Sequence, residues 1–414
     1  MLQKVTCGKK NLSDYKGLIN DNLLSEIKSL AKDLRGLRVL HINATKFGGG
    51  VAELLYSLIP LMQDVGLKAE WQTIVADSRL FEITKSFHNA FQGERYEITK
   101  QIERTYKRFN AYNAHMLEGE WDVIVIHDPQ PAAIPYYTPK DSIKFIWRCH
   151  IDTSCPNKKM WKLFAPFLKE YDASIFTMRE FVPKNVSIKR KFYVPPAIDA
   201  FSSKNRPLLK RTMKRILKNF DIDENRPLVT QVSRFDVWKD PLGVVKAYKI
   251  AKKKIPGLQL VLAGSLAHDD PEGWDIYKKI EDQTNKDKDI HIYTNLSGFS
   301  EMEVNTFQRN SDVIIQKSLR EGFGLTVSEA MLKETPVIGG NVGGIRLQIK
   351  DGVSGFLVKS PEECAEKIVY LIKNKNKAEE MGKKGRDIVA RNFLTPRLLR
   401  DHLKIYKKLI EKEC

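Results

Sequence analysis

Short apolar runs alternate with longer amphipathic stretches along most of this chain. Apolar runs of about four to eight residues without strict polar alternation are typical of strands that are buried on both faces of a sheet. The stretches between them repeat apolar residues at every third or fourth position, as residues 51–62 do, and therefore predict helices. Strands that alternate with helices predict βαβ units and parallel sheets. The expected strands cover residues 38–43, 69–77, 121–127, 144–149, 173–178, 191–194, 227–234, 258–264, 290–294, 312–315, 336–339 and 355–358.

This alternation of strands and helices occurs twice. The first series ends at Pro195-Pro196, a rigid dipeptide that is typical of a chain leaving a domain, and a new series starts at residue 227. A chain of 414 residues also exceeds the size at which one core usually divides. We therefore expect an α/β protein with two doubly wound, Rossmann-like parallel-sheet domains, residues 1–200 and residues 201–389.

The most informative stretch joins the expected strand at residues 312–315 to an expected helix. It runs from Glu321 to Glu329 as Glu-Gly-Phe-Gly-Leu-Thr-Val-Ser-Glu, with Gly324 near its middle. A glycine loop between strand and helix presents free backbone N–H groups, and the N-terminus of the helix favours an anion there. The two glutamates can accept hydrogen bonds from hydroxyl groups. An anion held beside hydroxyl groups describes a sugar nucleotide.

Two cationic residues accompany the first strand of the second series. Arg234 closes this strand, and Lys239 follows it in the next loop. The carboxyl ends of parallel strands share one edge of a sheet, so we expect both cations at the edge that carries the glutamate loop. An arginine fork and a lysine can hold a diphosphate without a metal ion. No Asp-x-Asp pair follows a strand, and we expect Asp269 and Asp270 to be solvated, so no metal site is predicted.

A second glycine loop follows the expected strand at residues 38–43. Gly48-Gly49-Gly50 has the strand–loop–helix layout of a phosphate-binding loop, but it matches neither GxGxxG nor an ending in GK[ST]. A binding loop and a close-packed turn without a ligand both stay open. A nicotinamide site is a further alternative, because it would use an acidic residue near the end of the next strand, where Asp77 lies.

Two histidines lie at the carboxyl ends of expected strands. His127 is followed directly by Asp128, and His150 is followed two positions later by Asp152. Open α/β sheets bind their ligands at this edge, although a lone histidine is often structural. Structural and functional interpretations both stay open for this pair.

The formal net charge of +18 is the unusual global property of the chain. One interpretation is a protein that binds nucleic acid. The other is a set of solvated, lysine-coated helix faces, which we favour because the lysine runs lie in polar, helix-like stretches. Arg-Gly and aromatic-basic repeats of the kind that bind single strands are missing.

The cysteines and the apolar runs indicate the cellular compartment. The five cysteines are scattered without CxxC spacing, and no apolar run is long enough to span a bilayer. The first residues lack the apolar core of a secretory signal. We therefore expect a cytoplasmic protein with reduced thiols and no membrane partner.

A set of these motifs, in this order along the chain, resembles the retaining glycosyltransferases of family 4. The set consists of Gly48-Gly49-Gly50, His150, Arg234, Lys239 and the segment Glu321-x7-Glu329, of which the last is the most specific. The resemblance implies the GT-B fold, in which two Rossmann-like domains face each other across a cleft.

Two further stretches narrow the resemblance within that family. Residues 127–131 and 147–152 resemble the trehalose-forming members, which are the glycosyltransferring synthases and the retaining trehalose phosphorylases, and the synthases are the closer match. The same resemblance implies that a C-terminal helix, at about residues 390–414, packs back on the first domain.

The resemblance also implies a role for each matching residue. Those implied to act in catalysis are Arg234, Lys239, His150 and Glu321. Those implied to bind the donor are Gly49, Gly50, Gly324, Leu325, Glu329 and Tyr293. For Tyr293 the expected contact is between its backbone and the nucleobase. Those implied to contact the acceptor are Asp128, Gln130 and Asp152.

The implied activity is the reversible transfer of glucose from ADP- or UDP-glucose to the anomeric hydroxyl of free glucose, which gives α,α-trehalose. A retaining phosphorylase that acts on glucose 1-phosphate, or another family 4 glycosyltransferase, is the alternative. The substrates are small molecules and no cofactor is required, although Mg²⁺ could stimulate the reaction without a protein metal site. A homodimer is an allowed assembly, and we expect no nucleic acid partner.

Glu321 and Glu329 also allow a hydrolase-like pair of acid and nucleophile. Because Glu321 precedes the loop and Glu329 lies inside the following helix, we expect them to face different parts of one ligand. The resemblance implies front-face retention instead, in which the leaving phosphate accepts the proton of the acceptor.

Overall fold

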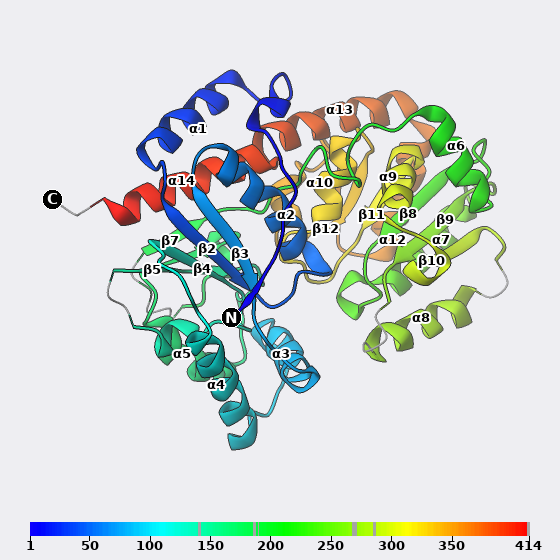
Figure 1. Ribbon diagram of the computed structural model, residues 1–414. Helices are drawn as coiled ribbons and strands as arrows, with labels where there is room; N and C mark the ends of the chain where they lie inside the picture. Colours follow the sequence, from blue (N-terminus) through cyan, green and yellow to red (C-terminus); the bar gives the residue numbers. More distant parts are fainter. Residues whose placement is uncertain (140–141, 185–187, 189, 267–270, 285–286, 412–414) are drawn as a thin grey trace. The chain divides into compact units, whose positions relative to one another are not determined.

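The computed structural model describes residues 1–139, 142–184, 188, 190–266, 271–284 and 287–411. These residues form two compact units. Unit 1 comprises Met1–Ala197 and Thr395–Cys414, and unit 2 comprises Ile198–Leu394. Each unit is built around its own, mostly parallel sheet (Figure 1).

The sheet of unit 1 has the strand order β1-β3-β2-β4-β5-β6-β7. Neighbouring strands are parallel, except that β1 pairs antiparallel with β3 at the edge. The order reverses between β2 and β4, which makes this the position at which an open α/β sheet is expected to bind ligands. The strands are β1 (Gln3–Lys4), β2 (Arg38–Asn43), β3 (Lys68–Thr73), β4 (Val123–His127), β5 (Lys144–Cys149), β6 (Ala173–Phe176) and β7 (Arg190–Tyr193).

Helices cover both faces of this sheet, with α1, α2 and α14 on one face and α3, α4 and α5 on the other (Figure 1). The second face is apolar, because Ile126 and Trp147 pack there among the aromatic residues of α3, α4 and α5. Strand residues of opposite parity, such as His41 and Arg148, point to the first face. The helices are α1 (Asp21–Asp33), α2 (Gly49–Asp64), α3 (Ser78–Phe91), α4 (Lys100–His115), α5 (Lys158–Leu168) and α14 (Thr395–Ile410), with short 3₁₀ turns η1 (Leu12–Tyr15), η2 (Ile134–Tyr137) and η3 (Arg179–Phe181).

The sheet of unit 2 is parallel throughout and has the order β10-β9-β8-β11-β12-β13. Its order reverses between β8 and β11, which are hydrogen-bonded neighbours. The strands are β8 (Leu228–Val232), β9 (Gln259–Gly264), β10 (Ile290–Thr294), β11 (Val313–Gln316), β12 (Val337–Gly340) and β13 (Phe356–Val358).

Two apolar clusters lie on opposite faces of this second sheet. Val229, Leu260 and Leu262 pack with α7, α8 and α12, while Leu228 and Val261 pack with α6 and α9. The helices are α6 (Lys210–Asn219), α7 (Pro241–Lys252), α8 (Pro271–Thr284), α9 (Glu301–Asn310), α10 (Leu325–Leu332), α11 (Ile345–Gln348), α12 (Pro361–Lys373) and α13 (Lys375–Asn392), with 3₁₀ turns η4 (Val237–Lys239) and η5 (Asn295–Ser297).

The expected strands all appear, with two differences at the edge of unit 1. The sequence did not predict β1, which is two residues long and lacks any apolar pattern. The strand expected to reach Asp77 ends at Thr73 instead. Asp77 is the N-cap of α3, where its Oδ1 accepts the Leu80 N–H at 2.9 Å. This cap gives Asp77 a structural role and weakens the nicotinamide alternative that relied on it.

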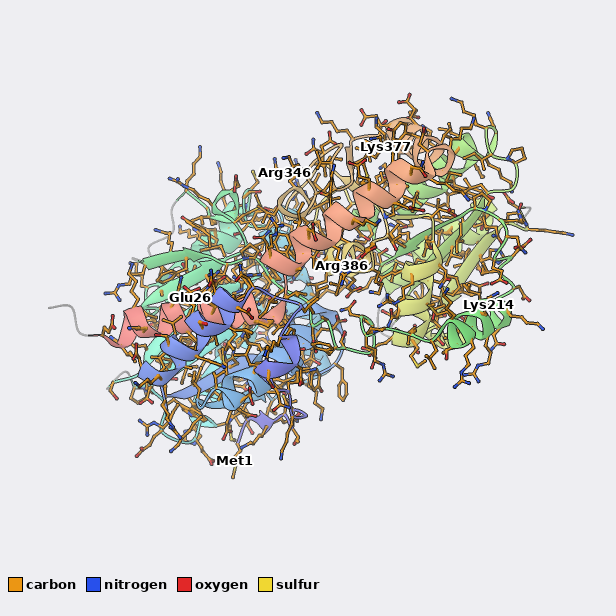
Figure 2. All side chains as sticks on the ribbon, turned by 90° about the horizontal axis from the view of Figure 1, so that it is seen from above. Met1, Glu26, Lys214, Arg346, Lys377 and Arg386 are labelled. Atoms are coloured by element: carbon orange, nitrogen blue, oxygen red, sulfur yellow. The ribbon has the colours of Figure 1, made fainter. Side chains whose placement is uncertain are left out.

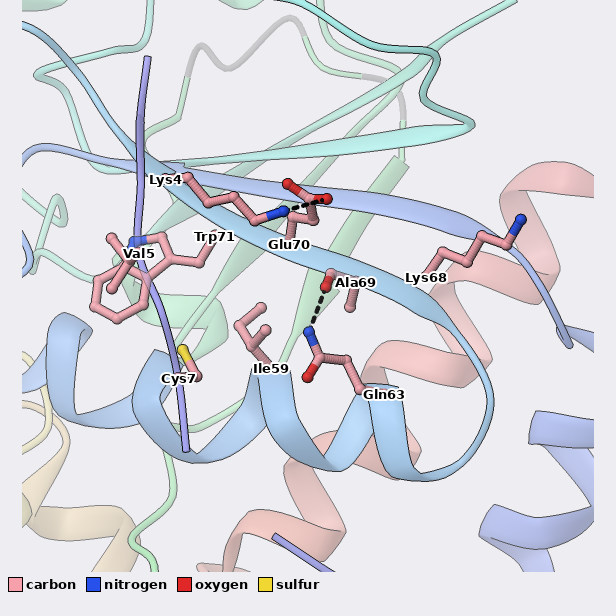
Figure 3. Close-up of a pocket in the computed structure, with 9 residues that line it drawn as sticks. All are labelled: Lys4, Val5, Cys7, Ile59, Gln63, Lys68, Ala69, Glu70 and Trp71. Atoms are coloured by element: carbon pink, nitrogen blue, oxygen red, sulfur yellow. Dashed lines mark hydrogen bonds and ion pairs between the residues drawn. The ribbon is translucent and has the colours of Figure 1, made fainter. Parts of the chain in front are cut away.

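A pocket of about 300 Å³ lies where β1 ends early and leaves part of β3 at the sheet edge (Figure 3). Lys4 and Glu70 form an ion pair of 2.8 Å across it, and Gln63 on α2 donates to the Ala69 carbonyl at 2.8 Å. The Gln63 amide thus occupies one backbone carbonyl at the sheet edge, where unpaired backbone groups otherwise invite pairing with another chain. The pocket includes none of the predicted site residues.

Charged side chains extend outward over the helices of both units (Figure 2). Lys214 on α6 pairs with Glu224 at 2.9 Å, and Lys377 on α13 pairs with Glu380 at 3.1 Å. Both lysines are exposed. These two lysines lie on solvated helix faces, and the lysine-coated interpretation of the whole charge stays a prediction.

Candidate active site

In unit 2, the predicted residues follow the two strands that flank the reversal of strand order. Arg234 and Lys239 come after β8, and Glu321 and Gly324 come after β11. The Leu319 N–H donates to the Trp238 carbonyl at 2.8 Å, which ties the two loops together. This edge of unit 2 therefore gathers the cationic residues and the glutamate loop of the sequence.

Lys239 and Glu321 form a largely buried ion pair. Lys239 Nζ lies 2.6 Å from Glu321 Oε2, and the exposed fractions of the two side chains are 18% and 9%. The same oxygen accepts the Ser318 hydroxyl at 3.1 Å, and Gln316 Nε2 lies 3.4 Å from it. Glu321 thus fixes the position of the lysine ammonium through one oxygen, while Oε1 has no hydrogen-bond partner among the described residues.

Gly324 forms the N-cap of α10 with φ of 81°, in the left-handed region that favours glycine. The first N–H groups of the helix, including that of Leu325, have no acceptor within the helix. Gln348 Nε2 holds the loop by donating to the Phe323 carbonyl at 2.6 Å. Thr326 Oγ1 donates to the Val232 carbonyl at 3.2 Å, which anchors the start of α10 to the end of β8. The structure therefore presents an anion-favouring helix terminus beside these strand ends.

Glu329 lies inside α10 and is buried. Its Oε2 accepts from Gln308 Nε2 at 3.1 Å, and its backbone carbonyl accepts from Lys333 Nζ at 3.0 Å. Lys333 also donates to Asn205 Oδ1 at 2.7 Å and to Gln308 Oε1 at 2.8 Å. Burial lowers the pKa of Lys333 to about 7. This network orients the Glu329 carboxylate and leaves its Oε1 without a partner among the described residues.

Two other predicted residues of unit 2 are engaged elsewhere. The Arg234 side chain is 54% exposed, and its Nη2 donates to Asp236 at 2.9 Å. The Tyr293 hydroxyl donates to the Phe220 carbonyl, and its ring stacks on Phe299. The role of Arg234 stays a prediction, and any donor contact of Tyr293 would come from its backbone.

In unit 1, His127 and His150 are hydrogen-bonded to each other. His150 Nε2 lies 3.0 Å from His127 Nδ1, and the two rings are stacked. His127 Nε2 in turn lies 2.9 Å from Nδ1 of His41 on β2. Burial and the neighbouring positive charge of Arg148 hold the pKa of His127 and of His150 well below the ordinary value. The rings are therefore neutral at physiological pH.

Asp128 fixes the backbone beside His150. It has φ of 60°, an uncommon conformation for a residue other than glycine, and its Oδ1 accepts the His150 N–H at 2.8 Å. Burial raises the pKa of Asp128 to about 7, although this hydrogen bond and Arg148 act against the increase. The structure thus places a strained, titratable carboxyl group beside His150 at the carboxyl edge of the sheet.

The other predicted residues of unit 1 lie at the same edge, either on loops or at the start of α2. Gly49 begins α2 with φ of 78°, and no atom lies within 4 Å of where its Cβ would be. Gly49 and Gly50 are exposed, so this loop is open and is not the close-packed turn of the alternative interpretation. Gln130 accepts from Asn110 Nδ2 through its backbone carbonyl at 3.2 Å. Asp152 Oδ1 accepts the Ser154 N–H at 3.0 Å, which is a local turn.

Sequence reasoning missed several side chains that support these residues. Ser318 and Gln316 at the end of an apolar strand, and Lys333 one turn after Glu329, were visible as polar positions beside predicted site residues. His41 could have been noticed as a polar residue within an apolar strand. Arg148 is buried, and its Nη1 and Nη2 make no hydrogen bond to described residues.

The described residues contain no group of three or more His, Cys, Asp or Glu side chains that could hold a metal ion. Asp269 and Asp270, which the sequence predicts to be solvated, lie outside the described residues. Within the part of the chain that the structure describes, the helices are too short or too polar to span a membrane.

Comparison with known proteins identifies the family. The model of the N-terminal domain of trehalose synthase matches residues 41–183, and the model of glycosyl transferases group 1 matches residues 212–388. A trehalose synthase from Rubrobacter xylanophilus is 46% identical over 415 residues, which cover 99% of this chain and 100% of that protein. A trehalose phosphorylase from Pleurotus pulmonarius is 27% identical over 403 residues, which cover 84% of this chain and 54% of that protein.

Among solved structures, sucrose-phosphate synthase from Thermosynechococcus elongatus matches with a TM-score of 0.71. The match covers 91% of this chain and 100% of that chain at 16% identity, a level at which the likeness concerns the fold, here GT-B. The expected α/β fold with two parallel-sheet domains is confirmed. With nearly half of its residues identical to a trehalose synthase of the same length, the chain belongs to the trehalose synthase family of GT-B glycosyltransferases.

Proposed function

We propose that this enzyme is a retaining glucosyltransferase that makes α,α-trehalose from a nucleoside diphosphate glucose and free glucose, reversibly. The observation that carries the proposal is the Lys239–Glu321 pair beside the N-terminus of α10. It combines a cation, free backbone N–H groups and a carboxylate oxygen that has no partner among the described residues, as a sugar diphosphate requires. ADP-glucose and UDP-glucose are both candidate donors.

Lys239 acts on the leaving group in this proposal. As the bond from the anomeric carbon breaks, negative charge grows on the diphosphate oxygen, and a cation already in position stabilises this transition state. Removing one group that donates a hydrogen bond to such a developing charge typically lowers kcat by about 10²–10³-fold. A helix terminus contributes only about 0.3–2 kcal/mol. In this proposal Arg234 turns from Asp236 toward the glucose donor. Lys239 and Arg234 together therefore supply more of the transition-state stabilisation than the helix terminus does.

The glutamates bind the donor in this proposal. Oε1 of Glu321 accepts a hydroxyl of the transferred glucose, and Oε1 of Glu329 accepts the ribose hydroxyls. Their other oxygens are already occupied by Lys239 and by Gln308. Because Lys239 holds the Glu321 carboxylate and Gln308 holds the Glu329 carboxylate, neither is placed as a free nucleophile, and the leaving phosphate takes the proton of the acceptor on the same face of the sugar.

His150 and the loops of unit 1 contact the sugars in this proposal. His150 lies beside the donor glucose, and Asp128, Gln130 and Asp152 contact acceptor hydroxyls. The support is their common position at the carboxyl edge of the first sheet, next to its reversal of strand order.

A retaining trehalose phosphorylase is the second candidate, and the 27% identity to such a protein favours it over unrelated activities. It would take glucose 1-phosphate and glucose and release phosphate without any nucleotide. The same Lys239 would then hold one phosphate instead of two.

The deciding experiment incubates the protein with glucose and, in separate reactions, ADP-glucose, UDP-glucose or glucose 1-phosphate. We expect a non-reducing disaccharide and one free nucleoside diphosphate per disaccharide with a nucleotide donor. Product from glucose 1-phosphate alone would support the phosphorylase. No disaccharide from any of the three donors would refute both.

A further inference from the structure

The hydrogen-bonded histidines of unit 1 continue beyond His41 to the C-terminal helix. His41 Nε2 lies 3.0 Å from the Tyr406 hydroxyl, and Nδ1 of His402 lies 3.0 Å from the same hydroxyl. His150, His127, His41, Tyr406 and His402, here called the histidine chain, thus form a single line of hydrogen bonds from the carboxyl edge of the sheet to α14. All except the partly exposed His150 are at most 1% exposed.

Burial keeps the rings of the histidine chain neutral, and nearby cations act in the same direction on His127, His150 and His402. Arg148 on β5 and Arg397 on α14 are buried cations near the chain, while Asp401 on α14 and Asp128 after β4 are the carboxyl groups near it. Burial lowers the pKa of His41 to about 3, and it holds the pKa of His402 well below the ordinary value. Each neutral imidazole carries one N–H and one bare nitrogen.

Counting hydrogens leaves two complete arrangements of the chain. Each of the four contacts needs one hydrogen, and each ring and the tyrosine hydroxyl have one hydrogen to donate. If His150 donates from Nε2, then His127 and His41 donate onward in turn, and the Tyr406 hydroxyl donates to His402. If His402 donates from Nδ1, every bond reverses, and His150 carries its hydrogen on Nδ1. In any mixture of these two arrangements, two hydrogens or two lone pairs would face each other, or the buried Tyr406 hydroxyl would lack an acceptor. Leaving buried polar groups unpaired in this way costs free energy.

We propose that the histidine chain fixes the tautomer of His150, and that His127, His41, Tyr406 and His402 are positioning residues for that ring. Nδ1 of His150, the nitrogen outside the chain, has no partner among the described residues and is the atom left to meet a sugar hydroxyl. The chain makes this atom either a defined donor or a defined acceptor. The catalytic consequence rests on the proposed function, whereas the tautomer itself can be measured without any substrate.

Tyr406 is the link whose removal tests the proposal with the least disturbance, because Tyr406→Phe deletes one buried oxygen. His41 and His402 then lose the hydroxyl that joins them. The histidine chain therefore no longer imposes either direction of hydrogen bonding on His150. Long-range ¹H–¹⁵N spectra of the eight histidines, labelled in the full chain, report the tautomer of each ring. We expect one tautomer at His150 in the unmodified protein and a mixture in Tyr406→Phe.

Tyr171→Phe is the matched control, because it removes another buried tyrosine hydroxyl of unit 1, one that donates to the Ala132 carbonyl at 2.8 Å. We expect it to leave the His150 tautomer unchanged. His402→Leu tests whether the direction of the hydrogen bonds sets the tautomer. With no nitrogen at position 402, the Tyr406 hydroxyl donates to His41. The bonds from His41 to His150 then run in the reversed arrangement, which places the hydrogen of His150 on Nδ1. An unchanged His150 signal in both chain variants would overturn the proposal.

Kinetics then test the consequence for the reaction. We expect Tyr406→Phe to lower kcat about 3- to 10-fold with little change in donor KM, which is the range that one net hydrogen bond represents. Tyr171→Phe should keep the full rate. If the His150 tautomer changes while kcat does not, the positioning role in catalysis is wrong. If the unmodified protein transfers no glucose but its His150 tautomer responds, the chain stands and the proposed function fails.

Discussion

Lys239 and Glu321 each serve as the buried counter-ion of the other, and this mutual dependence makes a mutation of either residue ambiguous. A buried charge that loses its partner carries a desolvation penalty, so stability and activity would change together. The two effects separate only if folding and turnover are measured on the same variant, against a control pair that is exposed.

We expect Lys239→Ala to lower kcat about 10²–10³-fold, because it removes a cation from the leaving group, and to change acceptor KM much less. Steady-state kinetics at saturating donor measure both. Lys246→Ala is the control, since Lys246 and Glu362 form a pair whose side chains are 62% and 55% exposed. Exposed pairs contribute little, so this variant should behave as the unmodified enzyme. Equal losses in kcat and in acceptor affinity for Lys239→Ala would contradict a leaving-group role.

Glu329 is the residue with which we test donor binding. Glu329→Ala should leave ribose hydroxyls without an acceptor and weaken binding of the nucleoside diphosphate by about 1–3 kcal/mol. Titration calorimetry with ADP and with UDP measures this directly. Glu380→Ala, on the exposed face of α13, is the control. Unchanged nucleotide affinity in Glu329→Ala would refute the ribose role.

The buried histidines make stability depend on pH in a direction that can be worked out. Their folded-state pKa values lie below the unfolded value, so below about pH 6.5 the unfolded chain binds protons that the folded chain does not. Stability should therefore fall on acidification, by up to about 1.4 kcal/mol per pH unit for each such ring.

Asp128 opposes this trend. Its pKa is raised to about 7, so between about pH 4 and pH 7 the folded chain holds a proton that the unfolded chain loses, and acidification favours folding. Asp128→Asn removes this opposition, and its free energy of unfolding should fall more steeply from pH 7 to pH 5 than that of the unmodified protein. Urea unfolding at several pH values measures both slopes. Parallel slopes would show that Asp128 has an ordinary pKa.

Elements of regular structure were predictable where burial dictated them. Strands such as β4 and β9 are apolar on both faces, so the sequence alone locates them. β1 could not be found, because its two polar residues belong to the sheet only through pairing with β3. Likewise, the sequence placed His127 and His150 at strand ends, but Tyr406 and His402, which continue their line of hydrogen bonds beyond His41, lie on a helix more than 250 residues later, and only the fold brings them together.

The start of α10 depends on a glycine that another residue could not replace without strain. Gly324→Ala should cost about 1–2 kcal/mol of stability, because φ there is 81°. Its Cβ would also lie 3.2 Å from Glu321 Cγ, so the ion pair with Lys239 must shift. Gly298→Ala has a similar φ of 79° with open space around it, and is the matched control. We expect similar losses of thermal stability in both variants and a loss of kcat in Gly324→Ala alone; full activity in Gly324→Ala would contradict this.

At the scale of the whole molecule, the charge of +18 suggests a salt test. Binding of a nucleotide sugar in this proposal uses two cations, the largely buried Lys239 and the exposed Arg234, so kcat/KM for the donor should change by no more than about a few-fold between 50 and 200 mM salt. A protein that bound nucleic acid through many phosphate contacts would lose about 10³–10⁵ in affinity over that range. Fluorescence anisotropy with a labelled oligonucleotide, run beside the enzyme assay, compares the two directly. Tight, steeply salt-dependent binding would revive the nucleic-acid alternative.

The chain passes between its two units twice, and α14 is the last element of unit 1 to be made. During synthesis on a ribosome, at about 5–20 residues per second, the stretch of about 200 residues that forms unit 2 takes roughly 10–40 s to emerge. Throughout that time the sheet of unit 1 lacks the helix that covers His41. A chain that stops after Leu394 would lack α14 and leave the histidine-lined face of the unit 1 sheet uncovered.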